Sequence, residues 1–477
     1  MPDPEILPPG LLIAAPSSGS GKTTVTLALL RRFRQLGRAV ASIKVGPDYI
    51  DPAFHAAASG RVCTNLDTWA MRGSTLRQLV RRAGQGSDFV LGEGVMGLFD
   101  GAPDGSGSTA DLALATGWPV VLVVDARGMA ASAAAVIYGF AGFDPRITLA
   151  GVIFNRVGSD RHALALQQAC EPLKVPVLGM VRRADALELP SRHLGLVQAG
   201  EHGRLEAFLD QAAADIAGRI DCERLASLAR SSPSPASGRE GMSGQGKGGP
   251  RPGMAPIGQR IAVARDTAFA FSYPFLLDAW QAAGVEVSTF SPLENQAPDD
   301  RADAVYLPGG YPELHAGRLA GNRTFLEGLK SAAGRGACVY GECGGYMLLG
   351  QGLIDVSGVR HRMAGLLPLE TSFAASADGP FRRGMTLGYR EAVLLSDSPF
   401  AKAGAVFRGH EFHYAHELPV QETSGVTIRG GTGDRLFRLT DARGDDLGPA
   451  GLRVAKVMGS FLHIVDASGD ICAGDSE

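Results

Sequence analysis

The chain has 477 residues, of which 45% are apolar and 20% charged, and its formal net charge is −3. This length predicts about two or three domains, and the small net charge gives no reason to expect nucleic acid or an acidic membrane as a partner. No apolar run reaches the roughly 18 residues of a membrane helix, and the acidic residues and prolines near the start do not fit a signal peptide. The six cysteines form no CxxC pair, so neither a zinc site nor a disulfide framework is predicted, and we expect a reduced, soluble, cytoplasmic protein.

The first part of the chain, residues 1–230, alternates short apolar runs with amphipathic patterns. The runs predict strands at 10–15, 39–44, 89–92, 120–124 and 150–154, and the first amphipathic pattern predicts a helix over 22–36. Runs that are apolar on both faces and separated by helices favour a parallel sheet covered by helices on both sides. We therefore predict an α/β domain here.

A glycine-rich segment, PSSGSGKTT at residues 16–24, stands between the first predicted strand and the first predicted helix. This is the context of a phosphate-binding loop, in which backbone N–H groups cradle phosphates, Lys22 reaches the β and γ oxygens and Thr23 holds Mg²⁺. Pro16 replaces the usual first glycine, and the alternative is a chance turn rich in glycine and serine. The predicted ATP-binding residues are Ser18, Gly19, Gly21, Lys22, Thr23 and Thr24.

Carboxylates follow the second and third predicted strands. Asp48 and Asp51 lie in GPDYIDP, and Glu93 and Asp100 lie in GEGVMGLFDG. Because ligands of open α/β sheets bind beyond the carboxyl ends of the strands, we expect these side chains to converge with Lys22. Several carboxylates near a triphosphate suggest Mg²⁺, and the predicted metal ligands are Thr23, Asp48 and Glu93. The alternative is that one or two of the carboxylates only cap helices or turns.

Two later positions are weaker candidates for the same site. Asp125 ends the apolar run 120–124, and Asn155 and Arg156 follow the run 150–154. Asn155 and Arg156 either contact the nucleotide base or form a simple turn.

A break in composition separates the two halves of the chain. Residues 231–259, SSPSPASGREGMSGQGKGGPRPGMAPIGQ, contain almost no large apolar residues and predict a flexible linker. The part from 260 to 477 then begins like the first, with strands at 260–264, 285–287 and 304–307 and a helix near 273–283. The predicted fold class is therefore α/β, with two three-layer domains that each contain a parallel sheet.

One cysteine, Cys343, is framed by glycines in the segment VYGECGGYM. An apolar strand leads into it and an apolar helix follows, so the thiol stands at a sharp elbow that the glycines permit. A helix N-terminus favours the thiolate, which predicts a nucleophile. The alternative is an inert buried cysteine, and that interpretation is given to Cys63, Cys170, Cys222, Cys338 and Cys472.

Two other segments complete a nucleophilic site. The turn in LPGGYPE offers the N–H of Gly310, and the residue after the nucleophile offers the N–H of Gly344, as donors to an oxyanion. His463 in SFLH is the predicted general base. The segment GHEFHYA contains HExH and not HExxH, so its histidines do not share a helical face and no metal is predicted there.

With these residues, the part from 260 to 477 resembles the class I glutamine amidotransferases of the subgroup found in cobalamin biosynthesis. The class usually ends its site with His-x-Glu, whereas this chain has Ile464 and Val465 after His463. Glu342 does not match the position of the usual acid. The resemblance thus implies a Cys343–His463 dyad and leaves open what orients His463.

The ordered motifs GPDYIDP, GEGVMGLFDG, GGYPELHA, YGECGGYM and GHEFHYA resemble the cobyrinic acid and hydrogenobyrinic acid a,c-diamide synthase family. The resemblance covers nearly the whole chain apart from the linker and both tails, and implies a dethiobiotin synthetase-like first half. It implies amidation of the a- and c-acetate carboxylates of a corrin through an acyl phosphate, with two ATP and two glutamines consumed. The family's synthetase-site motifs fall on Asp48, Tyr49, Asp51, Glu93 and Asp100.

The resemblance also sets the expected ligands and the alternatives. It implies ATP and Mg²⁺, with small-molecule substrates as the partners. The sequence leaves the oligomeric state open, with a homodimer as one assembly to test. Hydrogenobyrinic acid is favoured modestly over cobalt-bearing cobyrinic acid. The alternatives are a cobyric acid synthase-like amidase, which GPDYIDP disfavours, and a P-loop switch ATPase with a non-catalytic second half, which Cys343 and His463 disfavour.

Overall fold

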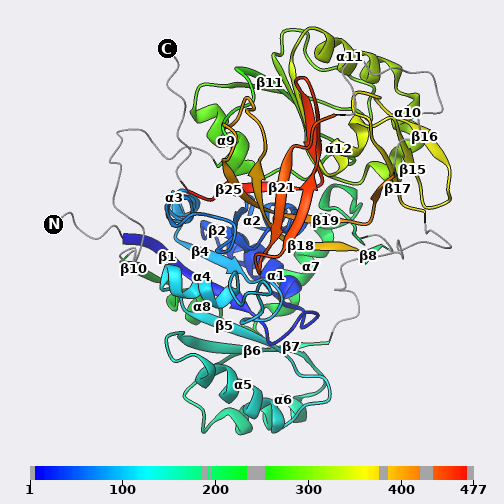
Figure 1. The fold of residues 1–477 in the computed structure, drawn as a ribbon. Coiled ribbons are helices and arrows are strands. Elements are labelled where there is room, and N and C mark those ends of the chain that lie inside the picture. The colour runs from blue at the N-terminus through cyan, green and yellow to red at the C-terminus, as the bar shows by residue number, and fades with distance from the viewer. Residues whose placement is uncertain are drawn as a thin grey trace. The chain divides into compact units, whose positions relative to one another are not determined.

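The computed structural model describes residues 6–183, 191–192, 195–233, 253–374, 385–418 and 433–469. The chain divides into two compact units, and each has a sheet of its own (Figure 1). Unit 1 comprises Met1–Trp69 and Gly73–Lys247, and unit 2 comprises Ala70–Arg72 and Gly248–Glu477. Within the described ranges, no helix has both the length and the apolar character that a membrane span requires.

Unit 1 contains an eight-stranded sheet in which seven strands follow the order β3-β2-β4-β1-β5-β6-β7 and β10 pairs with β1. The strand pairs along this order are parallel, whereas β10 runs antiparallel to β1. Its elements are β1 (Ile6–Ala14), α1 (Lys22–Gln35), β2 (Val40–Val45), α2 (Asp51–Ser59), β3 (Thr64–Leu66), α3 (Gly73–Gly84), β4 (Phe89–Glu93), α4 (Thr109–Thr116), β5 (Val120–Asp125), α5 (Ser132–Phe143), β6 (Leu149–Val157), α6 (Asp160–Cys170), β7 (Val177–Arg182), β8 (Ser191–Arg192), β9 (Gly195–Leu196), α7 (Leu205–Ile216), α8 (Cys222–Ser227) and β10 (Arg230–Pro233).

The core of unit 1 forms where α1 packs on the sheet. Leu11 and Ile13 of β1 and Leu27, Leu30 and Phe33 of α1 are all fully buried in one apolar cluster. The spacing of the α1 residues places them on one helical face, which is the pattern of a helix that covers a sheet. The predicted parallel α/β architecture is confirmed, and the predicted helix 22–36 ends one residue earlier, at Gln35.

Unit 2 contains a six-stranded sheet with the order β12-β11-β13-β14-β24-β23, in which β23 is antiparallel to its neighbour. Its elements are β11 (Arg260–Ala264), α9 (Pro274–Ala282), β12 (Glu286–Phe290), β13 (Ala304–Leu307), η3 (Pro312–His315), α10 (Ala316–Gly321), α11 (Arg323–Gly334), β14 (Cys338–Glu342), α12 (Gly344–Leu349), β15 (Gly352–Ile354), β16 (Arg360–Arg362), β17 (Glu370–Ser372), β18 (Thr386–Leu394), β19 (Val406–His413), β20 (His416–Leu418), β21 (Phe437–Asp441), β22 (Asp446–Ala450), β23 (Leu452–Val454), β24 (Val457–Ser460) and β25 (His463–Ala467).

Two further sheets of unit 2 were not among the sequence predictions. One is five-stranded and antiparallel, with the order β22-β21-β18-β19-β25, and the other is four-stranded, with the order β16-β15-β17-β20. The chain passes from the parallel sheet to the five-stranded sheet between β24 and β25, within the two residues Phe461 and Leu462. His463, the first residue of β25, therefore lies where one sheet gives way to the other.

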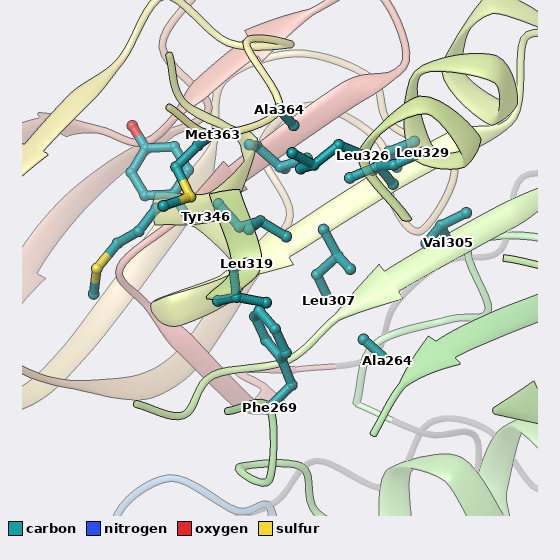
Figure 2. Packing of buried hydrophobic residues seen from close by; sticks show 14 of the residues in the cluster. Ala264, Phe269, Val305, Leu307, Leu319, Leu326, Leu329, Tyr346, Met363 and Ala364 are labelled. Carbon is teal, nitrogen blue, oxygen red and sulfur yellow. The ribbon is translucent and has the colours of Figure 1, made fainter. Parts of the chain in front are cut away.

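The apolar core of unit 2 lies between the parallel sheet and its helices, as Figure 2 shows for part of it. Leu307 of β13, Leu319 of α10, Leu329 of α11 and Tyr346 of α12 are fully buried, together with Phe269 of the loop after β11. Burial of these side chains holds α12, and thus the turn that precedes it, against the sheet.

The described ends of the predicted linker 231–259 belong to the two units. Ser232 in β10 pairs with Leu7 of β1, and Met254 and Ile257 are buried in unit 2. The Trp280 Nε1–H donates a hydrogen bond to the carbonyl of Met254 at 2.9 Å. The linker bounds were therefore too wide, because composition does not reveal a strand pairing or a few anchoring apolar residues. Residues 234–252 lie outside the described residues.

We predict that Leu329→Ala destabilises unit 2 by about 2–5 kcal/mol, because a fully buried side chain leaves a cavity. Urea denaturation followed by tryptophan fluorescence would measure the change. The matched control is Leu447→Ala, whose side chain is half exposed and should unfold close to wild type. Equal effects of the two substitutions would contradict the packing described here.

Candidate active sites

The predicted phosphate loop connects β1 to α1, and its backbone takes a conformation that requires glycine. Gly19 and Gly21 have φ values of 80° and 81°, in the left-handed region that glycine adopts without strain. A Cβ on Gly21 would lie 2.1 Å from Nδ2 of Asn155, so no side chain fits there. Ser18 is exposed in the loop, and Lys22, Thr23 and Thr24 form the half-buried first turn of α1.

Asn155 and Arg156, at the carboxyl end of β6, support this loop from one side. Asn155 Nδ2 donates a hydrogen bond to the carbonyl of Ser20 at 3.0 Å, and Arg156 Nη1 donates to the carbonyl of Gly19 at 2.7 Å. Arg156 also forms an ion pair with Asp125 at 2.6 Å. Asn155 and Arg156, for which the sequence predicted either a contact with the base or a simple turn, thus hold the phosphate loop in shape. The weaker candidate Asp125 contributes by pairing with Arg156.

Glu93 is the central side chain of the site in unit 1. It ends β4 and is completely buried. Its Oε1 accepts hydrogen bonds from Thr23 Oγ1 at 2.5 Å and from Lys44 Nζ at 3.0 Å, and lies 3.6 Å from Lys22 Nζ. Its Oε2 lies 2.6 Å from His55 Nε2. One carboxylate thus joins the phosphate loop to β2 and α2.

Lys44, at the end of β2, carries the second group of contacts. Its Nζ lies 2.5 Å from Asp51 Oδ2 and 3.9 Å from Asp48 Oδ2, and the side chain is buried. The other Asp48 oxygen accepts a hydrogen bond from the N–H of Ile50 at 2.7 Å, which fixes the turn before α2. Asp48, Asp51 and Glu93 therefore converge as expected, but their direct contact is the buried ammonium group of Lys44.

The charges of this cluster stabilise one another. Burial by itself lowers the pKa of Lys44, but Glu93 and Asp51 outweigh it and hold that pKa above its usual value. Burial by itself raises the pKa of Glu93, but Lys44 and the hydrogen bond with His55 hold it well below its usual range. Both groups are therefore charged in the folded protein, as buried ion pairs must be to balance the loss of hydration.

Two groups at the edge of the cluster have pKa values that are shifted toward the neutral form of each group. Burial lowers the pKa of Lys22, against the attraction of Glu93. Burial, followed by the charge of Asp51, raises the pKa of Asp48 to about 6. A bound triphosphate would supply Lys22 with the negative charge that the protein alone provides only in part.

His55 lies behind Glu93, away from the phosphate loop. It is completely buried in α2, with Nδ1 3.6 Å from the sulfur of Cys63. Burial lowers its pKa, but Cys63 and then Glu93 raise it more, to about 10, so the ring is cationic. The predicted inert Cys63 is buried, and its contact with His55 is part of this network.

Tyr49 and Asp100 have a different setting from the other predicted residues. Asp100 is exposed, and its Oδ2 accepts a hydrogen bond from the N–H of Gly97 at 2.9 Å. A Cβ on Gly97 would lie 2.7 Å from the carbonyl of Pro16, so this turn packs against the start of the phosphate loop. Tyr49 is half-buried in the turn between β2 and α2.

Sequence reasoning assigned no role to Lys44 or His55. A signal for Lys44 was available, because it is a charged residue at the end of a strand that is otherwise apolar and buried. His55 had no such signal, since a histidine among alanines in a helix is as often a core residue as a polar partner.

The residues of unit 1 fit a magnesium ion of the kind that accompanies a nucleotide. The Thr23 hydroxyl and the Glu93 carboxylate lie together beside Lys22, and Mg²⁺ prefers such hard oxygen ligands. Across the described ranges, no group of three or more His, Cys, Asp or Glu side chains is arranged to hold a metal alone. Mg²⁺ at a nucleotide site usually takes one or two protein ligands and completes its shell with phosphate and water.

The site of unit 2 is built on the predicted elbow. Cys343 stands between β14 and α12 with φ 46° and ψ −103°, a strained conformation for a residue with a side chain. Its N–H donates a hydrogen bond to the carbonyl of Ser460 in β24 at 2.8 Å. The parallel sheet on one side and α12 on the other thus hold the nucleophile in this strained turn.

Gly309 allows the two predicted catalytic side chains to approach each other. A Cβ on Gly309 would lie 2.3 Å from Cε1 and 3.2 Å from Nε2 of His463, and 3.3 Å from Cβ of Cys343. All three residues therefore border the same small space, and a residue larger than glycine at 309 would fill it. The structure brings together Cys343 and His463, which are distant in the sequence.

The helix N-terminus favours the thiolate of Cys343 as expected, through the N–H of Gly344, but burial outweighs it. Burial, followed by the charge of Glu313, raises the pKa of the Cys343 thiol, and the hydrogen bond from the Gly344 N–H offsets this only in part. The helix α12 has only six residues, so its dipole is weak, and Cys343 is 3% exposed. A thiol in this setting needs a neighbouring base to remove its proton if it is to act as a nucleophile.

The predicted oxyanion donors lie beside each other. A Cβ on Gly344 would lie 3.1 Å from the backbone nitrogen of Gly310 and 2.8 Å from Cδ of Pro312. A Cβ on Gly310 would lie 2.0 Å from the carbonyl of Ala268, so the turn requires glycine for close packing. Two N–H groups beside a nucleophile can stabilise an oxyanion, and the structure places the two predicted donors next to each other.

The histidines of GHEFHYA support the site as ring contacts. The ring of His410 stacks on that of His463, with centroids 4.9 Å apart, and its Nε2 lies 3.0 Å from the hydroxyl of Tyr273. The ring of His413 stacks on Phe461, and its Nδ1 lies 2.7 Å from the carbonyl of Ala415. The first stack joins β19 to β25, and the second joins β19 to the residues between β24 and β25.

Comparison with protein families agrees with the two sites. Residues 11–197 match the CobQ/CobB/MinD/ParA nucleotide binding domain, and residues 260–470 match the CobB/CobQ-like glutamine amidotransferase domain. The folds and matches together define an enzyme that joins a P-loop nucleotide-binding domain to a glutamine amidotransferase domain.

Full-length relatives narrow this class. A hydrogenobyrinate a,c-diamide synthase of Brucella anthropi is 51% identical, over 97% of this chain and 99% of the relative. The enzymes of that name from Brucella abortus and Rhizobium meliloti are each 50% identical, over 97% and 96% of this chain and 99% of each relative. The chain belongs to the hydrogenobyrinate a,c-diamide synthase family.

We predict that Lys44→Met lowers the free energy of unfolding of unit 1 by about 3–5 kcal/mol, because it leaves Glu93 and Asp51 as buried carboxylates without the cation between them. Chemical denaturation would measure this loss. Lys402→Met is the control, since its ion pair with Asp397 is exposed and its removal should leave unfolding as in wild type. A Lys44→Met variant as stable as wild type would refute the paired-charge interpretation.

We predict that Gly309→Ala lowers the rate of glutamine hydrolysis by about 100-fold or more, because the new Cβ displaces the His463 ring by the order of an ångström. A coupled glutamate assay would measure the rate. In the control, Gly321→Ala, the added Cβ meets no atom within 4 Å and should leave the rate unchanged. Normal hydrolysis by Gly309→Ala would mean that His463 does not need this position.

Proposed function

We propose that this chain amidates the a- and c-acetate carboxylates of hydrogenobyrinic acid in cobalamin biosynthesis, with ATP and glutamine as the other substrates. The observation that carries the proposal is the presence of two different sites in one chain: a phosphate loop with the Glu93–Lys44 cluster, and a Cys343–His463 pair at an elbow. The relatives that bear the name hydrogenobyrinate a,c-diamide synthase support the choice of substrate.

In the glutamine site, Cys343 attacks the side-chain amide carbon of glutamine while His463 takes the thiol proton. The N–H groups of Gly310 and Gly344 stabilise the negative oxygen of the tetrahedral intermediate. His463 returns the proton to the departing nitrogen, so ammonia leaves and a thioester forms. Water then hydrolyses the thioester to give glutamate and the free thiol.

In the nucleotide site, the role of the protein is to position and neutralise charge. An oxygen of the substrate carboxylate attacks the γ-phosphorus of ATP, ADP leaves, and an acyl phosphate forms. Ammonia then attacks the acyl carbon and phosphate leaves, which yields the amide. Lys22 and the N–H groups of the loop neutralise the phosphate oxygens, and the ammonium group of Lys44 is held at the carboxyl ends of the strands by Glu93 and Asp51.

Thr23 and Glu93 are the residues that would hold Mg²⁺ in this site, with Asp48 as a further carboxylate. A bound Mg²⁺ neutralises charge on the β- and γ-phosphates. Thr23 would exchange its hydrogen bond with Glu93 for this role, while His55 continues to orient the other oxygen of Glu93.

A reducing compartment suits this chemistry, because the mechanism needs Cys343 as a thiol. The structure gives Cys63, Cys170, Cys222, Cys338 and Cys343 as free cysteines. We place the enzyme in the cytoplasm on this chemical requirement.

We predict that Cys343→Ala abolishes synthesis with glutamine but retains synthesis with high ammonium, because only the glutamine site needs the thiol. Conversion of hydrogenobyrinic acid and of cobyrinic acid would be followed by mass spectrometry, which also reports whether one or two carboxylates react and which ring is accepted. Cys222→Ala, in α8 of unit 1, is the control and should use both nitrogen donors. Loss of both activities, or of neither, would contradict the proposed division between the sites.

A further inference from the structure

Glu342, the residue before the nucleophile, is a buried carboxylate that the mechanism above does not use. It ends β14 and is 1% exposed. Residues 340 and 342 share a face of the strand, and Tyr340 pairs in register with Tyr306 of β13. The hydroxyl of Tyr306 donates a hydrogen bond to Glu342 Oε2 at 2.8 Å. The carboxylate therefore lies among aromatic rings, where burying a charge is costly unless the charge is paired or hydrogen-bonded.

The carboxylate contacts the chain at His463 in two places. Its Oε1 accepts a hydrogen bond from the N–H of Ile464 at 3.3 Å, and its Oε2 lies 3.8 Å from Nδ1 of His463. The second distance is longer than a hydrogen bond. Hydrogen bonds of catalytic groups are often long without substrate, however, and shorten in the complex.

The other ring nitrogen of His463 lies on the side of the nucleophile. A Cβ on Gly309 would lie 3.2 Å from Nε2 of His463 and 3.3 Å from Cβ of Cys343. His463 and Cys343 therefore border one space. With Nδ1 toward a carboxylate, the ring is held in the tautomer whose Nε2 accepts a proton. Glu342, His463 and Cys343 thus have the order of acid, base and nucleophile.

The topology explains how a residue at this position can reach the base. In a strand, the side chain two residues after a histidine points to the same face. In β25 that residue is Val465, which has no carboxylate. Glu342 pairs in register with Ser460 of β24, the strand that leads to His463. The carboxylate therefore approaches His463 from the neighbouring strand.

We propose that Glu342 is the positioning residue of the glutamine site: its carboxylate holds the His463 ring with Nδ1 toward Oε2 and Nε2 toward the thiol of Cys343. The inference rests on the proposed function, since it concerns glutamine hydrolysis. When His463 takes the thiol proton, the imidazolium forms in a buried place, and the nearby carboxylate stabilises its charge.

The surroundings of both groups show why this stabilisation is needed. Burial, followed by the charges of His410 and His413, holds the pKa of His463 well below its usual value. Burial raises the pKa of Glu342 to about 8, against the hydrogen bonds from Tyr306 and a backbone N–H. The ionised form of Glu342 thus increases as the pH rises through about 8, and glutamine hydrolysis should increase over the same range.

The test is the Glu342→Gln variant, which keeps the shape of the side chain but removes its charge. We expect kcat for glutamine hydrolysis to fall by about 100-fold or more, with KM for glutamine changed little, because the ring loses its orientation. The rise of kcat/KM with pH near 8 should disappear. Synthesis with ammonium should continue at the wild-type rate, which also shows that the variant is folded.

The matched control is Glu391→Gln in β18, which removes a carboxylate of unit 2 that pairs with Arg408. This control should hydrolyse glutamine as wild type does. A Glu342→Gln variant with kcat within about twofold of wild type, or with the pH profile unchanged, would overturn the inference. Loss of activity by Cys343→Ala in the same assay would then show that the proposed function stands although the role of Glu342 does not.

A second variant keeps the inference testable if Glu342→Gln does not fold. Glu342→Asp retains a carboxylate but shortens its reach, so kcat should fall by about tenfold while the rise with pH remains. Unchanged kcat in Glu342→Asp would count against the positioning role. Absence of glutamine hydrolysis in wild type would instead contradict the proposed function itself.

Discussion

Close contact between backbones around the end of β14 is the constraint on which the glutamine site depends. A Cβ on Gly345 would lie 2.0 Å from the carbonyl of Leu307, and one on Gly459 would lie 2.4 Å from the carbonyl of Gly341. Side chains at these positions would separate α12 from the sheet and relax the strained turn at Cys343. The glycines therefore act through the space that they leave, and this space fixes where the thiol of Cys343, the ring of His463 and the backbone of Gly310 and Gly344 meet.

The nucleotide site rests on a different physical basis, which is the mutual neutralisation of buried charges. Glu93 alone would be too costly to bury, but Lys44, His55 and the edge residue Lys22 surround it. The same contacts link the phosphate loop, β2 and α2, so the geometry of the phosphate-binding residues depends on the charge balance behind them. Steric exclusion thus shapes one site and electrostatic pairing shapes the other.

The sequence predicted the local parts of both sites and missed the parts that depend on tertiary contacts. The phosphate loop and the Cys343 elbow were visible because glycine spacing and apolar runs are local signals. Lys44, His55 and Glu342 make their contacts with partners on other elements, such as Glu93 on β4 and His463 on β25. The five-stranded antiparallel sheet was missed because its register depends on strands as distant as β19 and β25. Composition alone also placed the linker bounds too far into the strand at Ser232 and the anchor at Met254.

The burial of Cys343 has a consequence for its chemical reactivity outside catalysis. Cys343 is 3% exposed, and burial raises the pKa of its thiol, which disfavours the thiolate, the form that reacts with peroxides and alkylating reagents. Under the proposed mechanism, an electrophile that resembles glutamine would escape this protection, because it would occupy the place of the substrate, where His463 takes the thiol proton. We therefore expect the fold to slow oxidation of Cys343 while leaving it open to reagents shaped like glutamine.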